Sequence, residues 1–176
     1  YLGFGNAHNL AANPETNYVY GVGTNTFSGG LHIVDVSNPE APFLAGSYDG
    51  AYSHDVQPVI YNGLDADYQG QEIVFCFNGP SGIAIVNAED KSDVYLIKEI
   101  SYENGFYTHQ GWLSEDHHML YFNDELDETY NGNNTRTYMM NVDDLDNPVI
   151  VGFYESDNPA IDHNLYTHNG RLYASN

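Results

Sequence analysis

The stretch LHIVDVSNPEAPFLAGSY, Leu31 to Tyr48, occurs in three versions along the chain. The version at Thr137–Tyr154 reads TYMMNVDDLDNPVIVGFY and aligns without a gap, so that Gly46 meets Gly152. A more divergent version, IAIVNAEDKSDVYLIKEI, lies between them at Ile83–Ile100. Each version has two alternating apolar runs separated by a polar turn, which is the pattern of two antiparallel strands joined by a turn. The sequence therefore predicts an array of β-repeats.

A further hairpin precedes the first copy, because the turn signal NPETN separates the runs AHNLAA and YVYGVG. Short strands also precede the other copies, which gives four-stranded units of the size of β-propeller blades. No segment keeps the 3.6-residue apolar period of a helix over three turns. The sequence predicts an all-β fold, a β-propeller with three complete four-stranded blades and part of a fourth. Within this single domain the expected blades cover residues 8–53, 54–108, 109–162 and 163–176.

The chain reads as an excerpt of a longer protein. It opens at Tyr1 without Met, and its last residues, LYASN, resemble a strand that is cut short. Because a propeller usually has about four to eight blades, we expect the remaining blades elsewhere in the same polypeptide.

The repeat resembles a known motif. The phrase LHIVDVSNPEAPFLAGSY resembles the LVIVP repeat, and with GFGNAHNLAANPETNYVYGVGTN, THQGWLSEDHHMLYFNDELDE, NTRTYMMNVDDLDNPVIVG and AIDHNLY it resembles the choice-of-anchor B family. This resemblance covers nearly the whole chain, and the middle copy departs most because it lacks the Pro and Gly of the others. It implies a secreted or surface-attached bacterial protein with a propeller-like body and an interchangeable C-terminal anchor. It implies no particular activity.

The chain is strongly acidic, with 25 Asp and Glu, 4 Lys and Arg and a formal net charge of −21. This charge repels nucleic acid and anionic membranes, and it favours cations as partners. It also suits a salty or extracellular setting, where ions screen the self-repulsion. No stretch has the roughly 20 apolar residues of a membrane span, and Cys76 in the run EIVFCF is expected to be a buried thiol. We expect an extracellular or bacterial cell-surface location, without nucleic acid partners or membrane insertion within this segment.

A histidine opens each four-stranded unit: His8, His54, His109 and His163. Because the first strand of a propeller blade lines the central channel, four equivalent imidazoles can converge there on a metal or ligand. The alternative is structural, with each histidine holding its turns and the neighbouring sheets in register. Repetition favours the structural role, because a metal needs only one set of ligands. On a regular strand, the opposite side would be taken by the residues that follow: Asn9, Asp55, Gln110 and Asn164.

The stretch NDELDETYNGNN is a candidate calcium site. Ca²⁺ takes about six to eight oxygen ligands from flexible acidic loops, and the candidate ligands here are Asp124, Glu125, Asp127, Glu128, Asn131 and Asn133. The stretch lacks the residue order of an EF-hand, and the alternative is a solvated acidic loop. The insertion LDADYQGQE, with Asp65, Asp67 and Glu72, is a weaker candidate of the same kind.

The sequence gives little evidence of a catalytic motif. Ser53, His54 and Asp55 are triad residue types, but neighbours on a strand point to alternate faces and cannot form a relay. Cys76 has no basic neighbour that would lower its pKa. No organic cofactor is indicated.

Loop tyrosines suggest a contact surface. Amphipathic aromatic rings suit sugars and proteins, although packing between blades is the alternative role for these residues: Tyr52, Tyr68, Tyr107 and Tyr130. The leading hypothesis is a non-catalytic scaffold that binds Ca²⁺ and presents acidic and aromatic loops to a protein or glycan. The second is a metal-dependent enzyme of the hydrolase or lyase type that uses the channel histidines.

Overall fold

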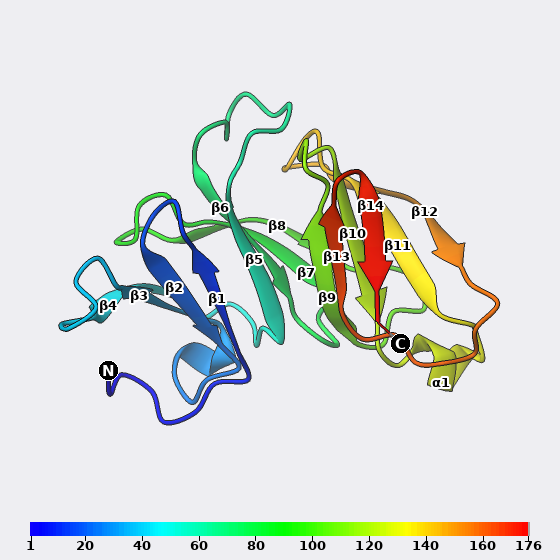
Figure 1. Ribbon diagram of the computed structural model, residues 1–176, viewed down its shortest axis with the longest axis horizontal. Helices are drawn as coiled ribbons and strands as arrows, with labels where there is room; N and C mark the ends of the chain where they lie inside the picture. Colours follow the sequence, from blue (N-terminus) through cyan, green and yellow to red (C-terminus); the bar gives the residue numbers. More distant parts are fainter. Residues whose placement is uncertain (176) are drawn as a thin grey trace.

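The computed structural model describes residues 1–175 and is almost entirely β-structure (Figure 1). Consecutive antiparallel strands form three four-stranded sheets and a closing hairpin. The first sheet contains β1 (Asn9–Asn13), β2 (Tyr18–Val22), β3 (Leu31–Asp35) and β4 (Phe43–Tyr48). The second contains β5 (Asp55–Ile60), β6 (Glu72–Phe77), β7 (Ile83–Asn87) and β8 (Tyr95–Ile100). The third contains β9 (Thr108–Leu113), β10 (Met119–Asp124), β11 (Arg136–Asn141) and β12 (Val149–Glu155), and the hairpin contains β13 (Leu165–His168) and β14 (Arg171–Ala174).

The innermost strands of the sheets lie together. β1 lies against β5, β5 against β9, and β9 against β13 (Figure 1). Sheets that meet through their first strands are arranged as propeller blades are around a channel. The predicted all-β, blade-like fold is therefore confirmed, although the described residues do not close into a ring.

The three copies of the repeat fold as equivalent hairpins: β3–β4, β7–β8 and β11–β12. In each hairpin the register shifts at the same repeat position, which leaves Ala45, Ile97 and Val151 as the extra residue of a β-bulge. Gly46 follows the first bulge at a point where a Cβ atom would lie 2.2 Å from the Lys91 carbonyl oxygen. The middle copy keeps the bulge without a glycine, so the apolar pattern sets the hairpin geometry.

The core lies between the sheets, because β6 is buried on both faces. Ile73, Phe75 and Phe77 pack towards the third sheet, whereas Val74 and Cys76 pack towards the first. Full burial of an aliphatic or aromatic side chain contributes about 1.5–3 kcal/mol. The prediction of a buried thiol is confirmed, and burial raises the pKa of Cys76 to about 12.

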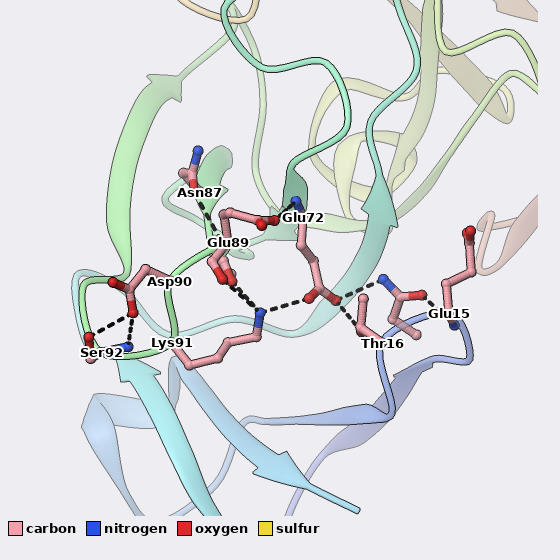
Figure 2. A network of polar contacts seen from close by, with 10 residues as sticks. Glu15, Thr16, Glu72, Asn87, Glu89, Asp90, Lys91 and Ser92 are labelled. Atoms are coloured by element: carbon pink, nitrogen blue, oxygen red, sulfur yellow. Dashed lines mark hydrogen bonds and ion pairs between the residues drawn. The ribbon is translucent and has the colours of Figure 1, made fainter. Parts of the chain in front are cut away.

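A buried ion pair of the second sheet is hydrogen-bonded to the first sheet (Figure 2). The Glu72 carboxylate, at the start of β6, accepts hydrogen bonds from Lys91 Nζ at 2.7 Å, Asn13 Nδ2 at 2.7 Å and Thr16 Oγ1 at 2.9 Å. Lys91 follows β7, whereas Asn13 and Thr16 belong to the β1–β2 hairpin. Glu72, a weak calcium candidate from sequence, is therefore a structural link between sheets.

Helical structure within residues 1–175 is limited to a 3₁₀ turn, η1 (Phe27–Gly29), and a short helix, α1 (Asp127–Asn131). No helix in this range is long and apolar enough to cross a membrane. The sequence predicted a loop after β10, and α1 corrects that prediction. Gly132 ends α1 in the left-handed conformation, with its N–H donated to the Glu128 carbonyl.

Candidate metal centres

The six predicted calcium ligands do not face one point. The Asp124 carboxylate, at the end of β10, accepts hydrogen bonds from Tyr102 Oη at 2.7 Å, Phe106 N at 2.7 Å and Tyr107 N at 2.9 Å. These bonds hold the segment that enters the third sheet. Asp124 is therefore a structural acceptor.

Of the less buried members of the set, Asn133 donates through Nδ2 to Asp127 Oδ2 at 3.2 Å, whereas Glu125 and Asn131 turn elsewhere. Glu125 Oε2 lies 3.9 Å from His109 Nε2. Asn131 Nδ2 donates to the Asn104 carbonyl at 3.2 Å. Neither side chain faces the buried acids of α1.

Asp127 and Glu128, on α1, form a buried acidic cluster with Asp162, which lies between β12 and β13. Asp162 N donates to Glu128 Oε1 at 3.3 Å, and Figure 1 shows α1 beside the segment that leads to β13. Four buried carboxylate oxygens have no hydrogen-bond partner: Asp127 Oδ1, Glu128 Oε2, Asp162 Oδ1 and Asp162 Oδ2. Such groups are costly to bury unless a proton or a cation satisfies them.

The surroundings of this cluster favour the neutral carboxyl. Burial, together with the charges of Glu128, Asp127 and Asp124, raises the pKa of Asp162 to about 9. Burial also raises the pKa values of Asp127 and Glu128, whose negative charges repel each other. A divalent cation would favour the ionised forms instead, because its charge offsets theirs.

Asp162 was missed by the sequence reasoning. It lies in the chain far from the acidic stretch, so composition could not connect them. One signal was available: the residue before each repeat histidine is Ala7, Ser53, Thr108 or Asp162, and only the last is ionisable.

The four repeat histidines form a continuous row at one end of the inner strands. The ring centroids of His8 and His54 are 3.9 Å apart, those of His54 and His109 are 4.3 Å apart, and those of His109 and His163 are 4.2 Å apart. Neighbouring ring planes are inclined by 44° to 47°. The repeat therefore places equivalent rings in contact across each pair of blades.

Burial keeps the middle of the row neutral. It lowers the pKa of His109 to about 4, with the neighbouring His54 and His163 adding to the effect. Burial and then His8 lower the pKa of His54. His54 Nδ1 lies 3.0 Å from the His109 carbonyl oxygen. Since a carbonyl only accepts, Nδ1 carries the proton and His54 Nε2 has the lone pair.

The row lines a pocket of about 480 Å³ at this end of the inner strands, together with Asn9, Asp55, Glu125 and Asn164. The sequence expected the polar neighbours of the histidines to face away. Three of the four line the same pocket, because their histidines precede the first strand residue and strand alternation does not apply. Gln110, which lies within β9 beside His109, does not line this pocket but a second cavity, which Asn9 and Asp55 line as well.

One end of the row can reach a carboxylate. His109, Glu125 and His163 each offer a ligand atom, and these atoms lie within 4.8 Å of one another. Asp65, Asp144 and Asp146 meet in the same way on the surface. Their oxygens, however, accept hydrogen bonds from nearby groups, among them Leu145 N at 2.8 Å.

The loop tyrosines have different environments. Tyr130 on α1 is 64% exposed, and its ring stacks on Phe106 with centroids 4.8 Å apart. Tyr107 packs edge-on against His54, and the Tyr68 hydroxyl donates to Asp146. Tyr52 is exposed but lies against Gly29. Tyr130 is therefore the most accessible aromatic ring of this group.

Residues 5–50, which comprise the first sheet, match the family model of the LVIVD repeat. This repeat is found in β-propeller-like surface proteins. The match corrects the repeat expected from the sequence, LVIVP, to LVIVD. No curated protein matches the chain. The wider assignment to the choice-of-anchor B family stays a prediction.

Proposed function

We propose that this chain is part of a non-catalytic, extracellular or bacterial cell-surface β-propeller scaffold that binds Ca²⁺ and presents acidic and aromatic loops to a protein or glycan. The LVIVD match and the blade-like sheets support the scaffold. The acidic surface suits an extracellular setting. The choice-of-anchor B resemblance supports surface attachment.

The observation that carries the proposal is the set of four unpartnered carboxylate oxygens on Asp127, Glu128 and Asp162. Ca²⁺ is bound by carboxylate, carbonyl and water oxygens in flexible geometry. The charged groups that act on Asp162 are themselves acids, and the donors at Asp127 Oδ2 are the neutral side chains of Tyr138 and Asn133, so a protein cation does not compensate these charges. A Ca²⁺ ion would supply the missing charge and the missing ligands for these oxygens together.

The mechanism links the ion to the contact surface. Asp127, Glu128 and Tyr130 all belong to α1. An ion bound to Asp127 and Glu128 from α1 and to Asp162 from the β12–β13 connection would fix the helix against that connection. The Tyr130–Phe106 stack would then be presented in one orientation, which lowers the entropy cost of a contact.

The test is thermal unfolding of the 176-residue chain at pH 8 with Ca²⁺ or with a chelator. We expect Ca²⁺ to raise Tm, since a ligand at 100 times its Kd stabilises by about 2.7 kcal/mol. Asp162→Asn should abolish this rise. Asp157→Asn is the matched control, because Asp157 is an exposed residue of the same connection, and it should keep the rise. Equal responses of the two variants would place the ion elsewhere and refute the proposal.

A metal-dependent hydrolase or lyase is the second candidate, and the meeting of His109, Glu125 and His163 favours it. The scaffold is preferred, because the buried acids require either a proton or a cation, whereas stacked neutral imidazoles are stable without one. Hydrolysis of ester or glycoside substrates that depends on Glu125 would establish the enzyme.

A further inference from the structure

His109, Glu125 and His163 come together from two neighbouring blades. His109 lies in β9 and Glu125 directly follows β10, its partner strand in the third sheet. His163 precedes β13, which lies against β9. Glu125 Oε2 and His109 Nε2 are 3.9 Å apart. Two donors on one tetrahedral Zn²⁺ are about 3.4 Å apart, and the Glu125 side chain, which is 33% exposed, has room to close the difference.

His109 has features of a metal ligand. Its side chain is only 3% exposed, yet the buried Nδ1 atom has no hydrogen-bond partner. A metal-bound imidazole normally donates its second ring N–H to a carboxylate or a backbone carbonyl. His54 makes this contact with the His109 carbonyl in the preceding blade pair.

The electrostatic state of the site also suits a cation. Metal ions bind the neutral imidazole and the ionised carboxylate. The net charge of −21 attracts divalent cations to the whole molecule. The pocket on this side gives an ion access to water or to a further ligand.

We propose that His109, Glu125 and His163 bind a divalent transition metal ion of the Zn²⁺ class at the channel mouth, where it clamps the β13–β14 hairpin to the third sheet. Two imidazoles and one carboxylate are a donor set that suits Zn²⁺, whereas Ca²⁺ prefers oxygen alone. The site shares no residue with the Asp127, Glu128 and Asp162 cluster. It is therefore independent of the proposed Ca²⁺ scaffold.

The experiment is calorimetric titration of the metal-free 176-residue chain with Zn²⁺ at pH 7.5 in excess Ca²⁺, which occupies the oxygen-only sites. We expect one Zn²⁺ per chain. Glu125→Gln and His163→Gln should each weaken binding by at least about 10- to 100-fold, because even the loss of an outer partner of a ligand costs that much. Both side chains are partly or fully exposed, and circular dichroism checks that the variants fold.

His8→Gln is the matched control, since His8 lies in the same row but outside the three-residue group. It should bind Zn²⁺ as the unmodified chain does. Amide hydrogen exchange gives a second measurement: Zn²⁺ should slow exchange in β13 and β14 of the unmodified chain and not of Glu125→Gln. The proposal fails if no stoichiometric ion binds, if both ligand variants bind as before, or if His8→Gln loses as much affinity as His163→Gln.

Discussion

Glu72 and Asp162 are equally buried, each 1% exposed, but their surroundings are opposite. Glu72 meets one ammonium group and two further donors, all within 2.9 Å (Figure 2). Neither oxygen of Asp162 has a partner, and the nearest charged groups are other acids. Glu72 lies where the second sheet meets the first, and Asp162 lies where the β12–β13 connection meets α1. Only the first junction is complete with protein groups alone.

The difference shows where the buried acids of this chain need a proton or a metal ion. Burying a carboxylate is costly unless it is paired. The chain has only 4 basic residues for 25 acidic ones, and Lys91 and Arg136 are already paired, with Glu72 and Glu155. A protein so poor in cations must hold its remaining buried acids with protons or with metal ions.

The largest expected effect comes from removing the partner of Glu72. Lys91→Met should destabilise the protein by about 3–5 kcal/mol, because it leaves a buried charge uncompensated. It also removes the ammonium group from the Tyr18 ring, 4.3 Å away. The measurement is urea unfolding at pH 7. Lys98→Met is the matched control, with an expected loss below about 0.5 kcal/mol. Equal losses would mean that the Glu72 pair contributes nothing beyond its packing.

The hairpins of the repeat could be predicted because their cause is local. Alternation of apolar residues and a turn sequence determine two paired strands. The same periodicity placed one histidine at each blade entry, so the row of rings follows from the repeat. The bulges at Ala45, Ile97 and Val151 needed the structure, because the three copies do not share a common residue there.

The metal centres were predictable only in part, because their members come from different blades. The acidic stretch drew attention to Asp127 and Glu128, but Asp162 completes their cluster from beyond β12. Glu125 was grouped with the acids of its own stretch, whereas the structure turns it to His109. These acids are close together in the sequence, which indicated one shared site. The folded backbone places them in separate sites.

The next prediction concerns stability against pH in the presence of a chelator. The pKa of Asp162 is raised to about 9 in the folded protein from an ordinary value of 3.8. The folded state therefore holds a proton that the unfolded state has released, and its stability falls as pH rises towards 9. From pH 7 to 9 we expect the free energy of unfolding to fall by up to about 1.4 kcal/mol per pH unit for this group.

Asp162→Asn should flatten this fall and make the protein more stable than the unmodified chain at pH 8, since an amide carries no charge to bury. Asp157→Asn should leave the profile unchanged. The lowered pKa of His109 acts in the opposite direction, with stability lost as pH falls below the ordinary histidine value of 6.5, so the window from pH 7 to 9 isolates the acids. A flat profile for the unmodified chain would show that another group compensates the Asp162 carboxylate in the folded protein.

The smallest expected effect is a count of protons. If Asp162 is protonated at pH 8 without a metal, Ca²⁺ must displace that proton when it binds. Calorimetric titration in buffers of different ionisation enthalpy should therefore give about one proton released per ion in the unmodified chain. Glu128→Gln should release fewer, because the charge of Glu128 contributes to the raised pKa of Asp162. Release of no proton at pH 8 would mean that the cluster is already ionised before the ion arrives. Another cation, bound before Ca²⁺ is added, would then have to compensate these acids as Lys91 compensates Glu72.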